Sequence, residues 1–291
     1  MIFKKKLHKL KYYYATPTPS ENYLNNFYSN IYFKKKITHT FSKKYSSIEL
    51  KNKKKRAQHI IDFLLNYVGR KKHLLDIGSG EGFLLKAAKN ENFKILGVDY
   101  SNFAIKKFNK NILKYFVERA PSEFLEELIL NKKKFNIITL QNVLEHVRNP
   151  SSLIKSIKKI LYKNSYLLVQ VPNDFKDLHF LLKKKKYIKD FWFFSPPQHL
   201  SYFNFENIKK FFRKNNFKLV DAISDFPIEL FLAFKENYVN NHKKKGFESH
   251  KARMFFDNYI LDLGFKKSSN FYRACNEIGI GRSMILLFKF R

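Results

Sequence analysis

Three glycines and an acid form a turn whose spacing could hold a nucleotide. Residues 74–85 pass from one apolar run to another through Gly78, Gly80 and Gly82. A second short apolar run ends at Asp99, 21 positions after Gly78. Glycines let a backbone approach a ligand closely, and a carboxylate at the tip of the second strand can accept hydrogen bonds from ribose hydroxyls. The pattern therefore predicts a β-α-β nucleotide-binding unit.

The glycine spacing differs from that of a dinucleotide site. G-x-G-x-x-G would require a third glycine at position 83, where this chain has Phe83. The chain has G-x-G-x-G instead, with Asp76 two residues before the first glycine. This arrangement resembles motif I of the class I S-adenosylmethionine-dependent methyltransferases.

A second motif strengthens the resemblance. Residues 135–140 are short, apolar and β-branched, which is typical of a buried parallel strand. They lead into V-L-E-H-V-R-N-P at 143–150, and the next expected strand, 166–171, ends in Pro172-Asn173. Both features resemble one branch of that family, which includes ubiquinone-type O-methyltransferases and bacterial sugar and natural-product methyltransferases.

The resemblance implies roles for individual residues. The glycine turn would approach the methionine part of S-adenosylmethionine, and Asp76 would orient the turn or the cofactor's ammonium. Asp99 would accept from both ribose hydroxyls or cap the following helix, Tyr100 would face adenine, and Gln141 and Asn142 would lie beside the sulfonium. The expected cofactor-binding residues are Asp76, Gly78, Ser79, Gly80, Gly82, Asp99, Tyr100, Gln141 and Asn142.

His199 is the candidate catalytic residue. It lies in a Pro-Pro-Gln-His-Leu segment among aromatic residues, after the fifth strand, at the edge where substrates enter open α/β sheets. Its imidazole could take the proton of a hydroxyl as the methyl group arrives, or it could only pin the loop. His146 could hold its loop or touch the substrate, and we do not assign it as a base. Trp192 is either a pocket wall or core.

The charge of the chain raises the question of nucleic acid. The net charge is +33, but only nine of the 57 basic residues are arginine, whose planar fork suits phosphate. The lysine runs are spread over the chain, at 4–6, 34–36, 53–55, 132–134, 183–186 and 243–245. This pattern favours a compositional bias over a nucleic-acid partner. An RNA-modifying methyltransferase that uses the basic surface remains the alternative, and a non-catalytic relative of the fold is a third hypothesis.

Composition bounds the remaining possibilities. No run approaches the roughly 18–20 apolar residues of a membrane span, and the basic start is not followed by the apolar stretch of a secretory signal. A single cysteine, Cys275, excludes an internal disulfide and a Cys-based zinc site, and we expect no metal site. These features predict a cytoplasmic protein.

The alternation of apolar strands and helical patterns predicts an α/β fold. The resemblance implies a Rossmann-like, doubly wound, seven-stranded sheet whose last strand, 283–288, is antiparallel between the fifth and sixth. We expect a basic N-terminal extension at 1–54, in which Ser20 caps a helix that either packs outside the domain or forms a lid. The methyltransferase domain would occupy 55–291, with insertions at about 174–202 and 229–280.

Together these features predict methyl transfer from S-adenosylmethionine to a small molecule. By analogy, the acceptor would be a sugar or surface-polysaccharide precursor, or a quinone-like phenol.

Overall fold

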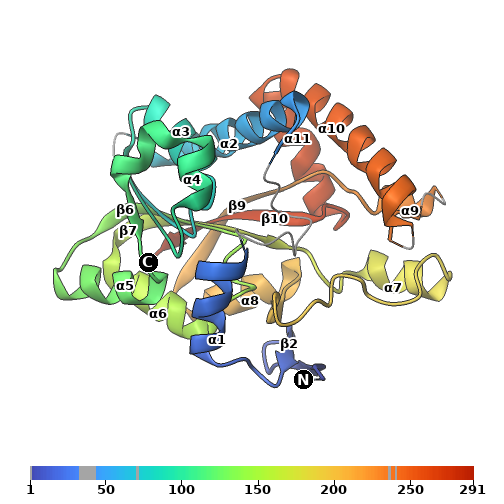
Figure 1. The fold of residues 1–291 in the computed structure, drawn as a ribbon, viewed down its shortest axis with the longest axis horizontal. Coiled ribbons are helices and arrows are strands. Elements are labelled where there is room, and N and C mark those ends of the chain that lie inside the picture. Colours follow the sequence, from blue (N-terminus) through green and yellow to red (C-terminus); the bar gives the residue numbers. More distant parts are fainter. Residues whose placement is uncertain (1, 33–43, 70–71, 235–236, 240) are drawn as a thin grey trace.

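A computed structural model describes residues 2–32, 44–69, 72–234, 237–239 and 241–291. The lysine run at 34–36 and the rest of 33–43 lie outside the described residues. Figure 1 shows a central twisted sheet with helices on both faces.

The central sheet has seven strands in the order β5-β4-β3-β6-β7-β10-β9. All neighbouring pairs from β5 to β7 are parallel, and β10 is antiparallel to both β7 and β9. The predicted fold class and the position of the antiparallel strand are therefore confirmed. The strands are β3 (His73–Ile77), β4 (Lys94–Asp99), β5 (Phe116–Glu118), β6 (Phe135–Gln141), β7 (Leu161–Pro172), β9 (Phe217–Ser224) and β10 (Ser283–Phe290).

Helices cover both faces because each of them has one apolar stripe to bury. On one face, α2 (Ser47–Val68) and α3 (Phe83–Asn90) enclose a core with Ile61 and Leu85. On the other, α5 (Pro121–Leu130), α6 (Pro150–Ile160) and α8 (Phe205–Lys214) bury Phe124, Ile157 and Phe212. Two short segments, α4 (Phe103–Phe108) and a 3₁₀ turn (Lys110–Tyr115), connect β4 to β5.

Two of the helices begin at hydrogen-bonded caps. The Ser20 side chain accepts from Tyr23 N, so α1 (Glu21–Asn26) begins where the sequence predicts, and a π-helical turn (Phe27–Tyr32) continues it. The helix α2 begins eight residues before the apolar pattern at 55, at a capping box between Ser46 and Glu49. The first turns of α2 are mostly polar and basic, so hydrophobic periodicity did not reveal them. The division at 54/55 thus falls inside one helix.

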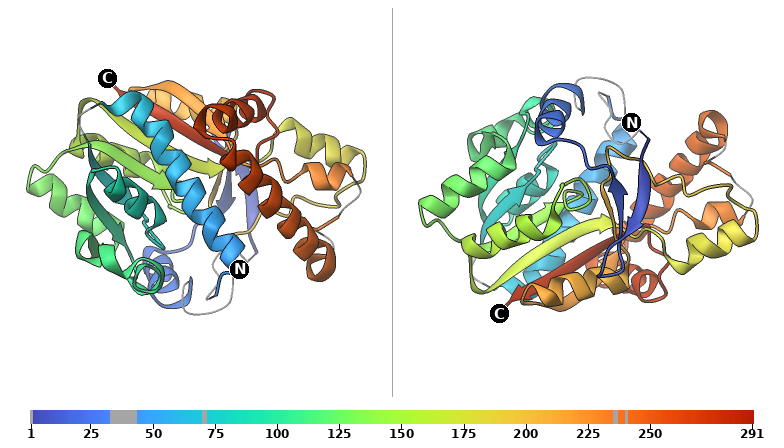
Figure 2. Two further views of the ribbon diagram at one scale, coloured as in Figure 1. Left: turned by 90° about the horizontal axis from the view of Figure 1, so that it is seen from above. Right: turned by 90° about the horizontal axis from the view of Figure 1, so that it is seen from below.

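The N-terminal residues form a small second sheet that the sequence did not suggest. Strands β1 (Lys4–Leu7) and β2 (Tyr13–Thr16) pair as a hairpin, and β2 also pairs with β8 (Ser201–Tyr202). Figure 2 shows this hairpin beside the chain that follows the fifth strand of the main fold. The ring centroids of Tyr12 and Phe203 lie 4.8 Å apart, so aromatic contacts pack the N-terminal extension against the main fold.

The two predicted insertions contain the remaining helices. The first contains α7 (Asp177–Lys184), and the second contains α9 (Leu230–Ala233), a π-helical turn (His242–Gly246), α10 (Phe247–Asp262) and α11 (Phe265–Glu277). None of the helices among the described residues is long and apolar enough to cross a membrane.

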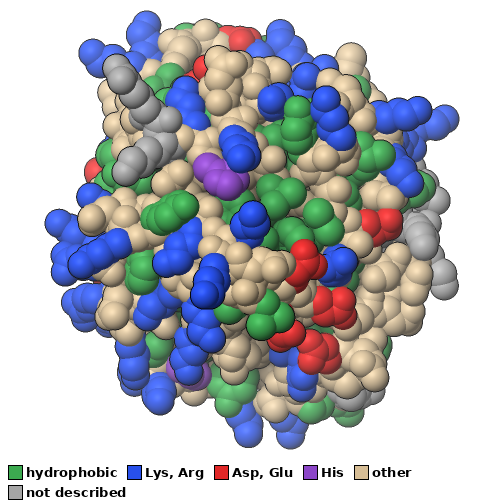
Figure 3. All heavy atoms as spheres, turned by 90° about the vertical axis from the view of Figure 1, so that its left-hand side faces the viewer, with side chains coloured by type: hydrophobic (Ala, Val, Ile, Leu, Met, Phe, Trp, Pro, Cys, Tyr) green, Lys and Arg blue, Asp and Glu red, His purple; other side chains and the backbone are tan. Residues whose placement is uncertain are grey.

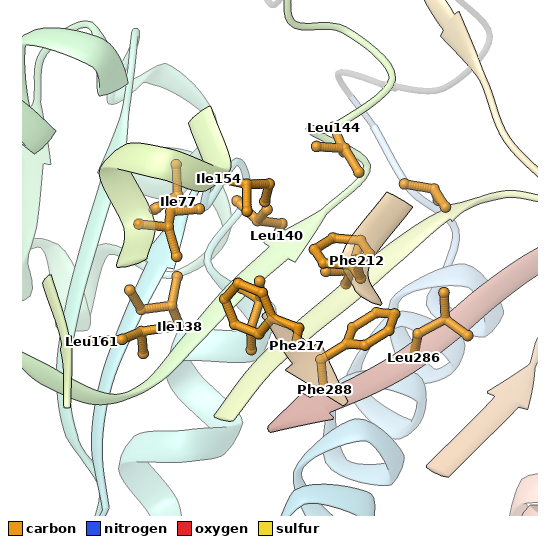
Figure 4. Close-up of a cluster of buried hydrophobic side chains, with 14 of the residues drawn as sticks. Ile77, Ile138, Leu140, Leu144, Ile154, Leu161, Phe212, Phe217, Leu286 and Phe288 are labelled. Carbon is orange, nitrogen blue, oxygen red and sulfur yellow. The ribbon is translucent and has the colours of Figure 1, made fainter. Parts of the chain in front are cut away.

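The packing of β10 generates a stability prediction. Phe288 is buried and stacks on Phe212 at a ring-centroid distance of 4.1 Å, in the cluster of Figure 4. Phe288→Ala should lower the free energy of unfolding by about 3–5 kcal/mol, because it leaves a cavity that the strands cannot close. Chemical denaturation measures this, with the partly exposed Phe290→Ala on the same strand as the control. Equal losses in the two variants would contradict the described packing.

Candidate active site

The glycine turn has the tight geometry that its sequence predicts. Gly78 N donates to the carbonyl of Val98 (2.8 Å), which ties the turn to the end of β4. Gly78 has a φ of +76°, and a Cβ there would lie only 2.4 Å from Val143 Cγ2. A side chain at this position is therefore excluded by both strain and space. In contrast, a Cβ on Gly80 would meet nothing within 4 Å, and Gly80 lines the cavity described below.

Asp99 ends β4 and faces the glycine turn. Its Oδ2 accepts from Gly80 N (2.8 Å) and its Oδ1 from Tyr100 N (2.7 Å). Burial raises the pKa of Asp99 to about 6, against the opposing effect of those two hydrogen bonds. Each oxygen keeps a free lone pair, which is what two ribose hydroxyls require.

Asp76 lies behind the turn and is not part of the cavity wall. Its Oδ1 accepts from the Thr139 hydroxyl (2.6 Å), and its backbone carbonyl accepts from the Ser79 hydroxyl (2.8 Å). Burial raises the pKa of Asp76 to about 7, and the nearby charge of Asp99 acts in the same direction. In this structure the side chain joins β3 to β6. Gly82 also lies outside the cavity wall, whereas the other predicted cofactor residues line it.

The end of β6 supplies Gln141 and Asn142 to the cavity. Gln141 Nε2 donates to Gln170 Oε1 (2.9 Å), and Asn142 N donates to the carbonyl of Gln170 (2.8 Å). Asn142 has a φ of +52°, a conformation that asparagine tolerates better than most residues. These bonds to β7 fix the direction in which the loop leaves β6.

The helix α1 and the turn after it form a wall of the same cavity. Tyr28 stacks on Tyr100 with ring centroids 5.5 Å apart, and its hydroxyl lies 3.0 Å from His146 Nδ1. Glu21 and Leu24 also line the cavity. The sequence predicts a helix here, either packed outside the domain or forming a lid, but it does not single out Tyr28, because one tyrosine among 17 carries no signal of its own.

Two histidines and a glutamate meet on the other side of the cavity. The rings of His146 and His199 lie edge to face at 4.8 Å, and ligand atoms of Glu145, His146 and His199 lie within 4.8 Å of one another. The spacing of these three groups would fit one metal ion between them. His146 Nδ1 donates to the carbonyl of Gln198 (2.7 Å), which supports the loop-holding role for His146.

Burial shifts the protonation of all three groups. It raises the pKa of Glu145 to about 8 and lowers those of His146 and His199 to about 3 and about 4. Among the described residues, neither oxygen of Glu145 nor Nδ1 of His199 has a hydrogen-bond partner. At neutral pH the group is therefore an uncharged acid beside two uncharged imidazoles.

Arg282 also lines the cavity, and the sequence analysis missed it. It donates to Asp174 Oδ1 (2.7 Å), while Lys176 and His179 contact Glu229 behind it. Lys176 and Arg282 hold the pKa of Glu229 low, at about 2, in spite of burial. Arg282 comes just before β10, which runs antiparallel to the other strands. The start of β10 therefore lies at the carboxyl edge of the parallel strands, so the topology and not a sequence motif brings Arg282 to the cavity.

These residues surround one cavity of about 790 Å³. It runs from the glycine turn and Asp99, past the end of β6, to His199 and Arg282. A cavity of this size, at the carboxyl end of a parallel sheet, is where open α/β folds bind ligands. Fold and site together define a Rossmann-like α/β domain whose cavity has the glycine turn and the carboxylate typical of nucleotide-binding sites.

Comparison with known proteins identifies the class. Residues 50–222 match the family model described as "Methyltransferase domain", more than half of the chain. The chain belongs to this family, and it contains a class I S-adenosylmethionine-dependent methyltransferase domain. The predicted class is confirmed.

Similarity to individual proteins is more distant. The chain is 35% identical over 104 residues to the ubiquinone biosynthesis O-methyltransferase of Pelagibacter ubique, covering 34% of this chain and 42% of that protein. It is 32% identical over 124 residues to the protein of the same description from Glaesserella parasuis, covering 40% of this chain and 52% of that protein. The chain thus spans about half the length of these curated relatives. A solved S-adenosylmethionine-dependent methyltransferase from Archaeoglobus fulgidus is 18% identical, with a TM-score of 0.49 over 81% of this chain and 94% of that one.

The residues present fit the cofactor. Asp99 offers two acceptor oxygens, the open side of Gly80 leaves backbone exposed to a ligand, and Tyr100 adds an aromatic surface. The loop at 118–120, for which the sequence predicts an acceptor for the adenine amine, fits less well. Glu118 is already bound to Asn102, and the neighbouring cavity wall is formed by Pro121 and Ser122.

Asp99→Ala should weaken binding of S-adenosylhomocysteine by about 30- to 1000-fold, on the order of 2–4 kcal/mol, because two charge-assisted hydrogen bonds are lost. For the unsubstituted protein, affinity should also fall as the pH drops through about 6, where Asp99 takes up a proton. Asp99→Asn should remove that pH dependence. Isothermal calorimetry measures these effects, with Glu206→Ala, an exposed acid on α8 outside the cavity wall, as control. An unchanged dissociation constant for Asp99→Ala would refute the assignment.

Proposed function

We propose that the protein transfers the methyl group of S-adenosylmethionine to a hydroxyl of a small molecule, with His199 as the general base. The observation that carries the proposal is that His199 lines the same cavity as Asp99 and the glycine turn. Bound there, the cofactor supplies an electrophilic methyl group on a sulfonium.

The first task of the chain is alignment and exclusion of water. The glycine turn, Asp99 and the end of β6 hold one side of the cavity, and the His199 segment holds the other. A nucleophile held in line with the methyl group gains from proximity and orientation alone. The extension supports this role, and we propose that Tyr28 and α1 close the cavity as a lid.

The second task is removal of a proton. Because its pKa is lowered to about 4, His199 is neutral at physiological pH and able to accept the proton of a hydroxyl. The resulting imidazolium would need a compensating charge. Ligand atoms of Glu145 and His199 lie within 4.8 Å of each other, and the pKa of Glu145 is raised to about 8. When the imidazolium forms, Glu145 would lose its proton to solvent, and its carboxylate would then balance the new positive charge.

Two observations bear on the chemical class of the methyl acceptor. The curated relatives carry names of O-methyltransferases in ubiquinone biosynthesis, which supports a phenol-like hydroxyl. The apolar part of the cavity lining, which includes Leu24, Leu125 and Leu153, would suit an aromatic ring. A sugar hydroxyl is the other acceptor that the sequence suggested.

A panel assay tests the proposal. Labelled S-adenosylmethionine is incubated with catechol-type phenols and with nucleotide sugars, and methylated product is measured. We expect transfer to a phenol, and His199→Gln should lower kcat by about 10²- to 10⁴-fold without changing affinity for S-adenosylhomocysteine. His73→Gln is the matched control, because His73 begins β3, at the end of the strand away from the glycine turn. Full activity of His199→Gln would refute the role of His199 as the general base, but it would leave the proposed methyl transfer intact.

The RNA alternative makes a different prediction. On the face drawn in Figure 3, Lys and Arg side chains occur over the whole surface and are densest at the lower left, interspersed with hydrophobic ones, and they do not form one stripe. Binding to single-stranded and duplex RNA should therefore be weak, non-specific and lost by roughly 0.2 M salt. Retention of RNA is measured with and without S-adenosylhomocysteine. Tight, sequence-selective binding above that salt concentration would replace the small-molecule proposal by the RNA one.

A further inference from the structure

The helix α10 is oriented with its polar side inward and its aromatic side outward. Its buried residues include Ser249, Asp257 and Asn258, and Asp257 is only 1% exposed. In contrast, Phe255 is 63% exposed and Tyr259 57%. Surface helices of globular proteins normally have the opposite pattern.

The inward polar face is satisfied, which fixes this orientation. Asp257 accepts from Asn52 Nδ2 (2.8 Å) and pairs with Arg56 (3.3 Å), and it is also bonded to the Tyr272 hydroxyl. Breaking such a buried ion pair would be strongly destabilising. Rotating α10 to bury its aromatic side would therefore leave charges unpaired in the core.

The outward residues form a continuous ridge. Phe247, Lys251, Phe255, Tyr259 and Leu263 recur every four residues, so each is a neighbour of the next in one row that winds slowly around α10 and reaches the residue after its end. The four apolar members are each at least 42% exposed, and Phe256, beside them, is 49% exposed. We call these six residues the α10 ridge. A contiguous apolar surface of this kind marks an interaction site more often than a solvated face.

Positive charge flanks the α10 ridge. Lys244 precedes α10 and is exposed, Lys251 lies within the ridge, and Lys266 and Lys267 follow on α11, both exposed. The last two occupy the first turn of α11, where the helix dipole disfavours cations, so local helix stability does not explain them. Two exposed acids lie nearby: Asp262 is paired with Lys55, and Glu248 occupies the first turn of α10.

We propose that the α10 ridge docks on an anionic phospholipid surface. Aromatic rings and a leucine would enter the headgroup boundary while the flanking lysines contact anionic headgroups, the arrangement used by interfacial helices. A second copy of the chain is a poorer partner, because two molecules of net charge +33 repel each other. RNA fits less well, because the exposed side chains of the ridge and its flanks include no arginine. This inference goes beyond the proposed methyl transfer and does not depend on it.

Vesicle co-sedimentation of the full chain tests the proposal. We expect binding to vesicles of phosphatidylcholine with phosphatidylglycerol and little binding to phosphatidylcholine alone. Phe255→Ser/Tyr259→Ser should weaken partition on the order of tenfold or more, through loss of apolar contact. Lys266→Gln/Lys267→Gln should weaken it by about fivefold per lysine.

Matched controls separate docking from general effects. Leu130→Ser removes an exposed apolar side chain on α5, and Lys133→Gln/Lys134→Gln removes an exposed lysine pair elsewhere, and both should bind vesicles normally. Circular dichroism and affinity for S-adenosylhomocysteine should be unchanged in every variant, so failure of docking is distinguishable from failure of the methyltransferase proposal.

Three outcomes would overturn the proposal. The first is absence of binding to anionic vesicles, and the second is equal loss in the ridge variants and the controls. The third is a partner other than lipid: a dimer in light scattering, or RNA binding at physiological salt, that Phe255→Ser/Tyr259→Ser abolishes.

Discussion

The close approach of Gly78 to Val143 fixes the relation between the two halves of the cavity. Because no Cβ fits between them, the turn after β3 packs directly on the loop after β6. That loop continues to Glu145, whose carbonyl accepts from Leu200 N (2.7 Å) and Ser201 N (3.0 Å). The backbone that carries His199 is thereby fixed relative to the glycine turn. Ser201 in turn pairs with β2, so the same run of contacts reaches the N-terminal hairpin.

The buried ionisable groups fall into two kinds. Lys176, His179 and Arg282 surround Glu229 and hold its pKa low, whereas burial raises the pKa of Asp174 in spite of its ion pair with Arg282. Glu145 has no such partner, and burial therefore keeps it protonated at neutral pH. Its charge can change only when a positive charge appears beside it. The ion pairs of Lys176 and Arg282 support the cavity wall. Glu145 is the acid whose protonation can change during the proposed reaction.

Sequence reasoning succeeded where local pattern and family geometry coincide. The glycine turn, the end of β6 and the antiparallel last strand all lie where the motifs predicted, because short apolar runs and glycine spacing determine them locally. It failed for Arg282, Tyr28 and the β1–β2 hairpin, which reach the cavity or the body through tertiary contacts between distant segments. It also missed the inside-out orientation of α10. A helix whose buried face is polar has no hydrophobic periodicity that points to its partner, and only the Asp257–Arg56 pair reveals it.

The stack of Tyr28 on Tyr100 restricts how the cofactor can bind. Ring centroids 5.5 Å apart leave no space for a third ring between them, since two stacking distances require about 7 Å. With α1 in its present place, an adenine ring beside Tyr100 would have to meet its edge or the face turned away from Tyr28. A sandwich between the two tyrosines would require α1 to move away, which would also remove the Tyr28 hydroxyl from His146. The position of α1 thus links the nucleoside end of the cavity to the histidines at the other end.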